Sequence, residues 1–318
     1  MTSSKTHGSR NIILRRGITL TEILVVVSIL GVLFALVVPA VQAVRETARK
    51  THCSANLRQL GIALNSYVTA LGALPSKTNG KHGFSVHSMI LPYLDNTSCY
   101  NALNFDVGCI RSANVTATKT PIAVFLCPSD YGNGTSGPWT NYACNVGYGY
   151  QKSQTYNGVF TVGRNNPITS LADITDGTST TALAAEWVRG SENDLSHVVY
   201  RTKTVMIAAS EYDSFISACQ GTDVNPARSF SATKGTYWAR GDHGKTAYTH
   251  DILIGGRSCY NHVYVREGAW TAASLHGHGS SVLFADGHLH FVRNSISLAT
   301  WRAIGTRSGG EQVSIQDK

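Results

Sequence analysis

The chain has 318 residues, of which 42% are hydrophobic and 14% are charged, with 30 glycines and 8 prolines. This balance excludes a disordered or collagen-like chain, because it holds enough apolar residues to build a packed core. The formal charge is +8, but four basic residues precede the first apolar run, and no window combines clustered basic residues with interleaved aromatic ones. The composition therefore gives no strong sign of nucleic-acid binding.

The first feature along the chain is an apolar run near the N-terminus. No charged residue occurs from Ile23 to Val44, and a helix over this run can cross a bilayer once at about 1.5 Å per residue. The basic residues before it place the N-terminus in the cytoplasm and the rest of the chain outside the inner membrane. A secretory signal peptide cut after Ala43 and a plain signal anchor are the ordinary alternatives. Both leave Glu22 unexplained, because a carboxylate at the head of a membrane helix is costly.

Residues 15–22, RRGITLTE, stand directly before the apolar run. This segment resembles the class III signal of type IV prepilins and type II secretion pseudopilins. The resemblance implies that residues 1–17 are a basic leader, that prepilin peptidase cuts between Gly17 and Ile18, and that Ile18 is then N-methylated. Glu22 matches the family's acidic residue at the fifth position of the mature chain, while Ile18 departs from the family's usual Phe.

The same resemblance implies a structural subunit whose partners are prepilin peptidase, the inner membrane and other pilin or pseudopilin subunits. In a filament, the Glu22 carboxylate of one subunit would meet the charged α-amine of Ile18 on its neighbour. In low dielectric such a pair offsets the cost of burying both charges, and methylation of the amine keeps its positive charge.

One long helix is predicted over residues 18–71, with a transmembrane part at 18–44 and an amphipathic part at 45–71. Pro39 should kink or loosen it, because proline removes one helical hydrogen bond. Gly72 and Pro75 should end it. An apolar stripe at steps of four and three marks the second part; it consists of Cys53, Leu57, Leu60, Leu64, Tyr67 and Leu71.

A second resemblance begins at Cys53, in the segment CSANLRQLGIAL. It is similar to bacterial prepilin-like proteins with a large C-terminal domain of unknown function (DUF1559 type), which carry a signature of His, nine residues and Asp-Gly. Here the signature runs from His276 to Asp286 and Gly287. Other matching segments are Phe125–Asp130 (FLCPSD), Asp176–Ser179 (DGTS) with Glu186, and Trp301–Ala303 (WRA) before Gly309–Glu311 (GGE). The resemblance implies no particular activity.

Residues 72–318 read as short strands between Gly, Asn, Asp and Thr turns, with a late helix near Leu298–Ile304. We therefore expect an α+β fold, in which the long helix packs on a mainly antiparallel, extracytoplasmic sheet domain. Asp286-Gly287 favours a two-residue type I′ hairpin turn. The register that follows pairs Ala285 with His288, Phe284 with Leu289, and Val282 with Phe291, and so predicts one wholly apolar face.

Seven cysteines are scattered along the chain with no Cys-x-x-Cys pair. An extracytoplasmic domain favours some disulfides, and the odd count leaves at least one thiol unpaired. Proximity in sequence suggests Cys99–Cys109 and Cys127–Cys144, although spacing alone leaves the partners open. We expect Cys53 to be a free, buried thiol on the helix stripe.

Twelve histidines, several of them beside acids, raise a metal site or a hydrolase as a second hypothesis. No His-Glu-x-x-His spacing, Gly-x-Ser-x-Gly elbow or phosphate loop supports it, so exposed polar turns and strand edges are the preferred interpretation, with no enzyme and no cofactor. If a structural metal is bound, the family match singles out Asp176, Glu186, His276 and Asp286. The sequence thus favours a pilin-like or pseudopilin-like subunit over a membrane-anchored, non-polymerising binding or metal-dependent module.

Overall fold

The computed structural model describes residues 19–79, 82–130, 137–150, 157–162, 168–190, 199–202, 208–221, 230–231, 233–260 and 268–311. The chain divides into two compact units, Met1–Thr47 and Ala48–Lys318. The predicted leader at 1–17 and the predicted processing residues Gly17 and Ile18 lie outside the described residues.

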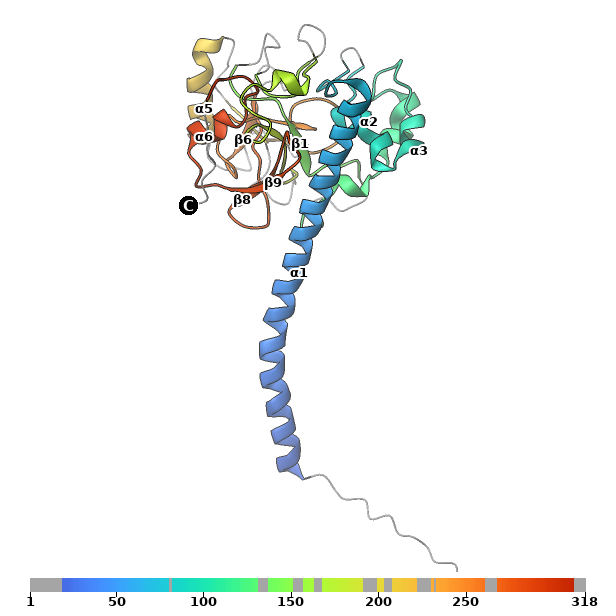
Figure 1. Ribbon diagram of the computed structural model, residues 1–318. Helices are drawn as coiled ribbons and strands as arrows, with labels where there is room; N and C mark the ends of the chain where they lie inside the picture. The colour runs from blue at the N-terminus through green and yellow to red at the C-terminus, as the bar shows by residue number, and fades with distance from the viewer. Residues whose placement is uncertain are drawn as a thin grey trace, which may run out of the picture. The chain divides into compact units, whose positions relative to one another are not determined.

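The N-terminal unit consists of the first part of helix α1, which runs from Leu20 to Leu71 (Figure 1). Thr19 and Glu22 form its N-terminal cap: the backbone N–H and the hydroxyl of Thr19 both donate to the Glu22 carboxylate at 2.8 Å. In return, the Glu22 backbone N–H donates to the Thr19 hydroxyl at 3.3 Å, which completes a capping box. Pro39 lies inside α1, and the helix continues on both sides of it. Among the described residues, α1 is the one helix long and apolar enough to cross a membrane.

The last part of α1 belongs to the C-terminal unit and buries the predicted stripe. Leu57, Leu60 and Leu64 are buried in its core, whereas Leu71 is 62% exposed, so the stripe stops before the helix does. A side chain at Gly61 would meet Leu283 at 2.8 Å, and glycine therefore lets the helix approach the sheet closely. The remaining buried positions of α1 are Cys53, Asn56 and Ala63.

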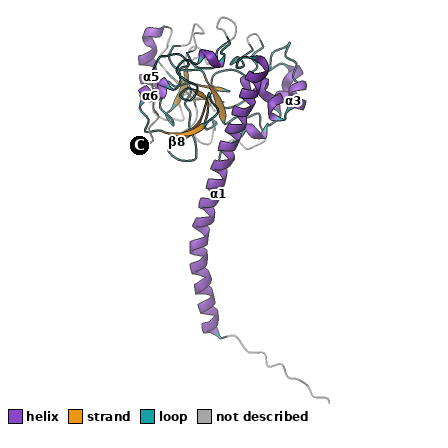
Figure 2. Ribbon diagram, viewed as in Figure 1, coloured by secondary structure: helices purple, strands orange, loops and turns teal. Residues whose placement is uncertain are grey.

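The strands lie in the middle of the C-terminal unit, with short helices around them (Figure 2). Five strands form one sheet in the order β5-β1-β2-β8-β9, and four form another in the order β4-β3-β6-β7. Each sheet has one parallel pair, β1 with β5 and β3 with β6, and its other pairs are antiparallel. The strands are β1 Tyr142–Asn145, β2 Ala182–Glu186, β3 Val199–Arg201, β4 Phe230–Ser231, β5 Ala247–Tyr248, β6 Ser258–Tyr260, β7 Gly268–Ala269, β8 Gly279–Phe284 and β9 Leu289–Arg293. The expected α+β class with a mostly antiparallel sheet is confirmed.

Both faces of the five-stranded sheet are covered. Leu183 and Leu283 pack with α1 in one apolar core, while Val282 and Phe284 pack with Trp301 in a second core on the opposite face. Because successive residues of a strand point to opposite faces, a strand covered on both sides has a continuous apolar sequence. This accounts for the run ALAA at the start of β2 and VLF at the end of β8.

The β8–β9 hairpin is located correctly by the sequence, but its predicted turn and register are wrong. Leu283 lies opposite Leu289 and Val282 opposite His290, one residue away from the expected pairing. The Gly287 N–H donates to the Phe284 carbonyl, and Gly287 alone in the turn has a positive φ, of 89°. A type I turn followed by a left-handed glycine uses three loop residues, which shifts the pairing by one. The predicted single apolar face does not form.

The short helices lie mostly in segments where the sequence predicted strands and turns. The late helix is confirmed as α6, Leu298–Ala303. The other α-helices are α2 Val86–Ile90, α3 Thr97–Asn101, α4 Val115–Lys119 and α5 Tyr212–Gly221; the 3₁₀ helices are η1 Leu91–Leu94, η2 Ser112–Asn114, η3 Ala123–Phe125, η4 Leu171–Asp173 and η5 Ala209–Glu211. Except for α5, which has 10 residues, these other helices have three to five residues and carry no resolvable sequence periodicity.

Two disulfides are formed, and neither is a predicted pair: Cys53 bonds Cys127, and Cys219 bonds Cys259. The expectation that Cys53 is free is therefore wrong, as are the suggested pairs Cys99–Cys109 and Cys127–Cys144. Cys144 is a free thiol on β1, packed in the core beneath α1, and Cys99 and Cys109 are also free. Proximity in sequence failed because the packing of α1 joins segments 74 residues apart.

Candidate functional site

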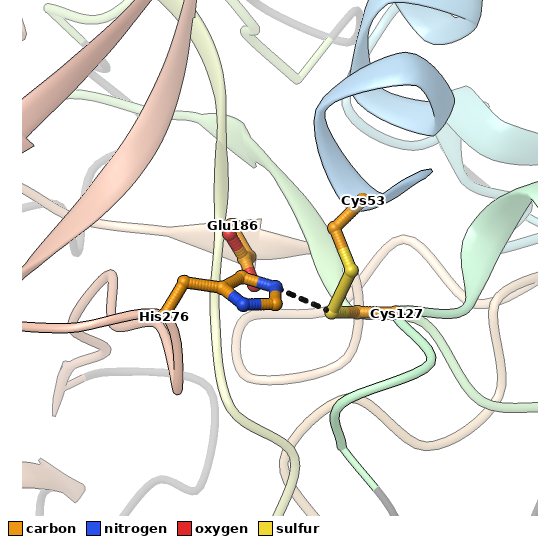
Figure 3. A group of neighbouring side chains, drawn as sticks. All are labelled: Cys53, Cys127, Glu186 and His276. Atoms are coloured by element: carbon orange, nitrogen blue, oxygen red, sulfur yellow. Dashed lines mark hydrogen bonds and ion pairs between the residues drawn. A yellow bond between two sulfur atoms is a disulfide. The ribbon is translucent and has the colours of Figure 1, made fainter. Parts of the chain in front are cut away.

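Four side chains with metal-ligating or redox chemistry lie together beside α1 (Figure 3). They are Cys53, Cys127, Glu186 and His276, and one potential ligand atom from each lies within 4.8 Å of the others. Cys53 comes from α1, Cys127 follows η3, Glu186 ends β2, and His276 precedes β8. The group therefore joins four segments that are distant in sequence.

Hydrogen bonds to α1 hold Cys53 and Cys127 in place. The buried hydroxyl of Tyr142 donates to the Cys53 carbonyl at 2.9 Å, and the Asn56 side chain donates to the Leu126 carbonyl at 2.9 Å. The Cys127 N–H in turn donates to the Asn141 side-chain oxygen at 2.9 Å. Polar groups at this depth are costly to leave unpaired, so these bonds select one position of α1 on the sheet.

A buried ion pair, Asp130 with Arg189, anchors the segment that carries Cys127. Asn141 donates to the Asp130 carboxylate at 2.5 Å, and the Arg189 side chain lies 3.2 Å from that carboxylate. Nearby, burial lowers the pKa of Lys234 to about 7, and its Nζ donates to the Thr271 carbonyl at 2.9 Å. Separating Asp130 from Arg189 would leave a buried charge without its partner, which is costly. The contact therefore holds the segment that carries Cys127 in one conformation.

Glu186 is a carboxyl group in an apolar setting. Its side chain is 3% exposed, and Oε2 has no hydrogen-bond partner among the described residues. Burial raises the pKa of Glu186 to about 8, the negative charge of Asp130 adds to the rise, and hydrogen bonds from Ser274 and Ser281 oppose it. The positive charge of Lys50 also opposes the rise, but burial is the largest effect, so this carboxyl is mainly protonated at neutral pH.

His276 lies between the acid and the disulfide. Its imidazole is 1% exposed, and Nε2 is 3.3 Å from the Cys127 sulfur and 3.7 Å from Glu186 Oε1. Figure 3 shows the ring edge directed at the sulfur. A histidine so placed can donate a proton to a leaving thiolate or bind a metal through Nε2. The sulfur, nitrogen and oxygen atoms together form a donor set typical of zinc when the cysteines are reduced.

Two of the four residues singled out from the sequence belong to this group, and two do not. Asp176 instead accepts hydrogen bonds from the Thr306 hydroxyl and from the N–H groups of Gly309 and Gly310 at 2.7–2.9 Å. Asp286 accepts from the His288 N–H and contacts its ring in the β8–β9 turn. Within the described residues, both aspartates therefore act as local structural anchors.

The sequence interpretation missed Cys53 and Cys127 as site residues. Each stands in a segment that carries the family resemblance, CSANL and FLCPSD, and this was the available signal. Spacing could not reveal the site, because its residues come together only when α1 packs on the sheet. Asp176, Glu186, His276 and Asp286, in contrast, were chosen from the family resemblance, which does not say which of them lie together in space.

The histidines of two neighbouring acid–histidine pairs, Asp242-His243 and His250-Asp251, also have structural roles. The sequence predicted exposed positions for them, but both histidines are buried. His250 is buried, with Nδ1 2.6 Å from the Trp301 carbonyl and Nε2 2.9 Å from the Tyr248 hydroxyl. His243 is buried and stacks on Trp270 with ring centroids 4.9 Å apart. Burial lowers the pKa of both histidines, so each is a neutral core residue.

Comparisons with known proteins place the chain in a family. No curated protein and no solved structure gives a significant match. The family described as "Protein of unknown function (DUF1559)" matches residues 42–299, which is well over half of the chain and includes all four residues of the candidate site. The chain therefore belongs to the DUF1559 family.

Proposed function

We propose that this protein is a structural subunit of the type IV pilin or type II secretion pseudopilin kind. In this proposal, prepilin peptidase removes residues 1–17 and methylates Ile18, and the mature chain assembles through α1 into a filament or pseudopilus. The subunit spans the inner membrane once, with the N-terminus in the cytoplasm and the chain after Arg45 outside. It performs no catalysis.

The uncovered apolar half of α1 is the observation that carries this proposal. No residue of its most apolar 18-residue window is buried within the chain, and large side chains such as Leu24, Phe34 and Leu36 are exposed. A helix that is apolar on all sides must be covered by lipid or by other helices. In a pilin-type subunit, lipid covers this helix in the membrane, and the helices of other subunits cover it in the filament.

The capping box at Thr19 and Glu22 gives Glu22 a local role that competes with the assembly role. A Glu at this position stabilises the first turn by reaching back to the N-cap residue. Gln can do the same without a charge, whereas only a carboxylate can pair with a neighbour's α-amine. The two roles therefore respond differently to Glu22→Gln.

The test compares Glu22→Gln with Glu22→Ala in cells that carry the assembly machinery. Membrane insertion should persist in both variants, because each makes the helix less charged. The proposal expects both to lose most of the assembled subunit, measured as sheared filaments or as a cross-linked ladder. Assembly retained in Glu22→Gln and lost in Glu22→Ala would assign Glu22 to helix capping alone. Wild-type levels in both would remove the assembly role.

A membrane-anchored module that does not polymerise is the second candidate, and the buried group around Glu186 favours it. A subunit with a purely structural task has no evident need for a buried carboxyl group whose Oε2 has no hydrogen-bond partner among the described residues. Cross-linking of wild-type membranes separates the two functions, since a tethered module remains monomeric while a subunit forms a ladder.

A further inference from the structure

The Cys53–Cys127 disulfide does not account for the two residues beside it. A disulfide is neutral and needs neither an acid nor a base to be stable. Yet Glu186 is almost fully buried next to it, and nothing in the described part of the chain bonds its Oε2. The buried His276 imidazole lies 3.3 Å from the Cys127 sulfur. Burying both groups costs free energy that the oxidised state does not recover.

The spacing of the four donors suits a metal ion. With Zn–S bonds of about 2.3 Å and Zn–N or Zn–O bonds of about 2.0–2.2 Å, ligand atoms of a tetrahedral site lie about 3.3–3.8 Å apart. His276 Nε2 is 3.3 Å from the Cys127 sulfur and 3.7 Å from Glu186 Oε1. The two sulfur atoms would have to separate, and rotation of their side chains can supply that once the bond between them is broken.

We propose that the reduced form of this protein binds one Zn²⁺ through Cys53 Sγ, Cys127 Sγ, His276 Nε2 and the Glu186 carboxylate. Two thiolates and an imidazole favour zinc over magnesium, calcium or manganese, which prefer oxygen ligands. Four protein ligands leave no open position, so the metal is structural and not catalytic. This site does not depend on filament assembly.

The two states interconvert by thiol–disulfide exchange. A dithiol reductant transfers two electrons and two protons to the Cys53–Cys127 bond and itself becomes a disulfide. Binding of Zn²⁺ then displaces the two thiol protons, and any proton on Glu186, to solvent. In the reverse direction, a disulfide oxidant takes two electrons from the thiolates and two protons from solvent and becomes a dithiol, while the Cys53–Cys127 bond forms and Zn²⁺ is released to solvent.

In both states the same segments stay joined. The disulfide links α1 to the loop after η3, and the metal would link these two to the end of β2 and to the segment before β8 as well. A newly exported chain whose thiols are not yet oxidised would thus already have α1 fastened to the sheet. The buried Glu186 carboxylate would then lie against a doubly charged ion, which favours its ionised form.

The test uses the full-length chain in detergent, reduced with a metal-free phosphine under anaerobic conditions and titrated with Co²⁺ as a spectroscopic substitute for Zn²⁺. We expect one Co²⁺ per chain, with the intense d–d absorption of tetrahedral coordination and a thiolate charge-transfer band. Added Zn²⁺ should abolish both signals. Oxidised protein should show neither.

Single substitutions identify the ligands. Glu186→Gln and His276→Gln should each weaken Co²⁺ binding at least about tenfold and alter the d–d spectrum, because losing even a residue that only hydrogen-bonds to a metal ligand costs about that much. The matched controls are Cys219→Ser/Cys259→Ser, which removes the other disulfide, and His288→Gln, which removes an exposed histidine. Both controls should bind as the wild type does.

Two results would overturn the proposal. One is a reduced wild-type chain that binds no Co²⁺, whether or not it remains folded, because the metal is expected to hold the reduced site together. The other is a spectrum and affinity unchanged by both Glu186→Gln and His276→Gln, which would show that cysteines alone bind the ion and that this site does not exist.

Discussion

His87 is a neutral base in the core beneath α1. Its Nε2 donates to the Tyr142 carbonyl at 3.0 Å, while Nδ1 has no hydrogen-bond partner among the described residues. Burial lowers the pKa of His87 to about 4, and the bond to Tyr142 opposes this only in part. Protonation would therefore place an unpaired N–H and a charge in the apolar core.

The free energy of unfolding should depend on pH through this residue. Because the folded-state pKa lies below the unfolded value of about 6.5, the unfolded chain takes up the proton first. Stability from this source is complete above about pH 6.5 and is lost as the pH falls towards 4, by about 3 kcal/mol in total.

Urea unfolding of wild type and His87→Gln, followed by tryptophan fluorescence between pH 7.5 and 4.5, measures this effect. The variant should be less stable at pH 7.5, and the difference between the two proteins should shrink as the pH falls. His288→Gln, at an exposed histidine, serves as the control. Parallel pH curves for wild type and His87→Gln would contradict the prediction.

Gly287 is needed for its backbone conformation. Its φ of 89° lies in the left-handed region, where a β-branched residue is strained. Gly287→Val should therefore destabilise the domain by about 1–3 kcal/mol, whereas Gly287→Asn should cost less, since Asn tolerates that region. Equal losses in the two variants by thermal unfolding would refute the backbone explanation.

At the scale of elements, the packed face of α1 is the main source of stability for the helix–sheet contact. Leu60 is 1% exposed and Ile62, two residues on, is 59% exposed. Leu60→Ala should cost about 2–5 kcal/mol, through lost apolar burial and the cavity left behind. Ile62→Ala, the control on the same helix, should change stability by no more than about 0.5 kcal/mol. Similar urea midpoints for both variants would mean that α1 does not pack on the sheet as described.

The sequence predicts elements better than it predicts their pairing. The long helix, its stripe, α6 and the position of the β8–β9 hairpin follow from local periodicity and turn residues, which are short-range signals. The register failed because Asp-Gly is compatible with two turn types, and the choice depends on how Leu283 and Leu289 pack beneath α1. The second sheet and its parallel pair were not foreseen, since strands of two or three residues carry almost no pattern.

The candidate site could be predicted from the sequence only in part, because its residues are brought together by tertiary packing. Glu186 and His276 were named from a family resemblance, but Asp176 and Asp286 were named on the same ground and lie elsewhere. The residues that complete the site, Cys53 and Cys127, are 74 positions apart. The two cysteines come together because Tyr142 donates to the Cys53 carbonyl and Asn56 donates to the Leu126 carbonyl. No sequence pattern predicts these hydrogen bonds.

At the scale of the whole molecule, the first residue of the mature chain distinguishes prepilin processing from a signal peptide and from a plain anchor. The proposed function expects intact-mass analysis to give a chain that begins at Ile18 with one added methyl group. A chain beginning at Val44 would mean an ordinary signal peptide, and an uncut chain would mean a plain anchor. A strain without prepilin peptidase is the control, in which residues 1–17 should remain attached.

The bond between Cys53 and Cys127 also determines how the molecule would respond to force. Tension applied along α1 from its N-terminal end reaches Cys53 and passes through the sulfur atoms to Cys127, in the loop after η3. The intervening segment, whose described residues include the end of α1 and six short helices, has a sequence separation of 74 and is then bypassed. Fully extended, that segment would measure about 250 Å at about 3.4 Å per residue. A chain closed at this point by sulfur, or by a metal held between the same two cysteines, cannot lengthen by that amount when it is pulled.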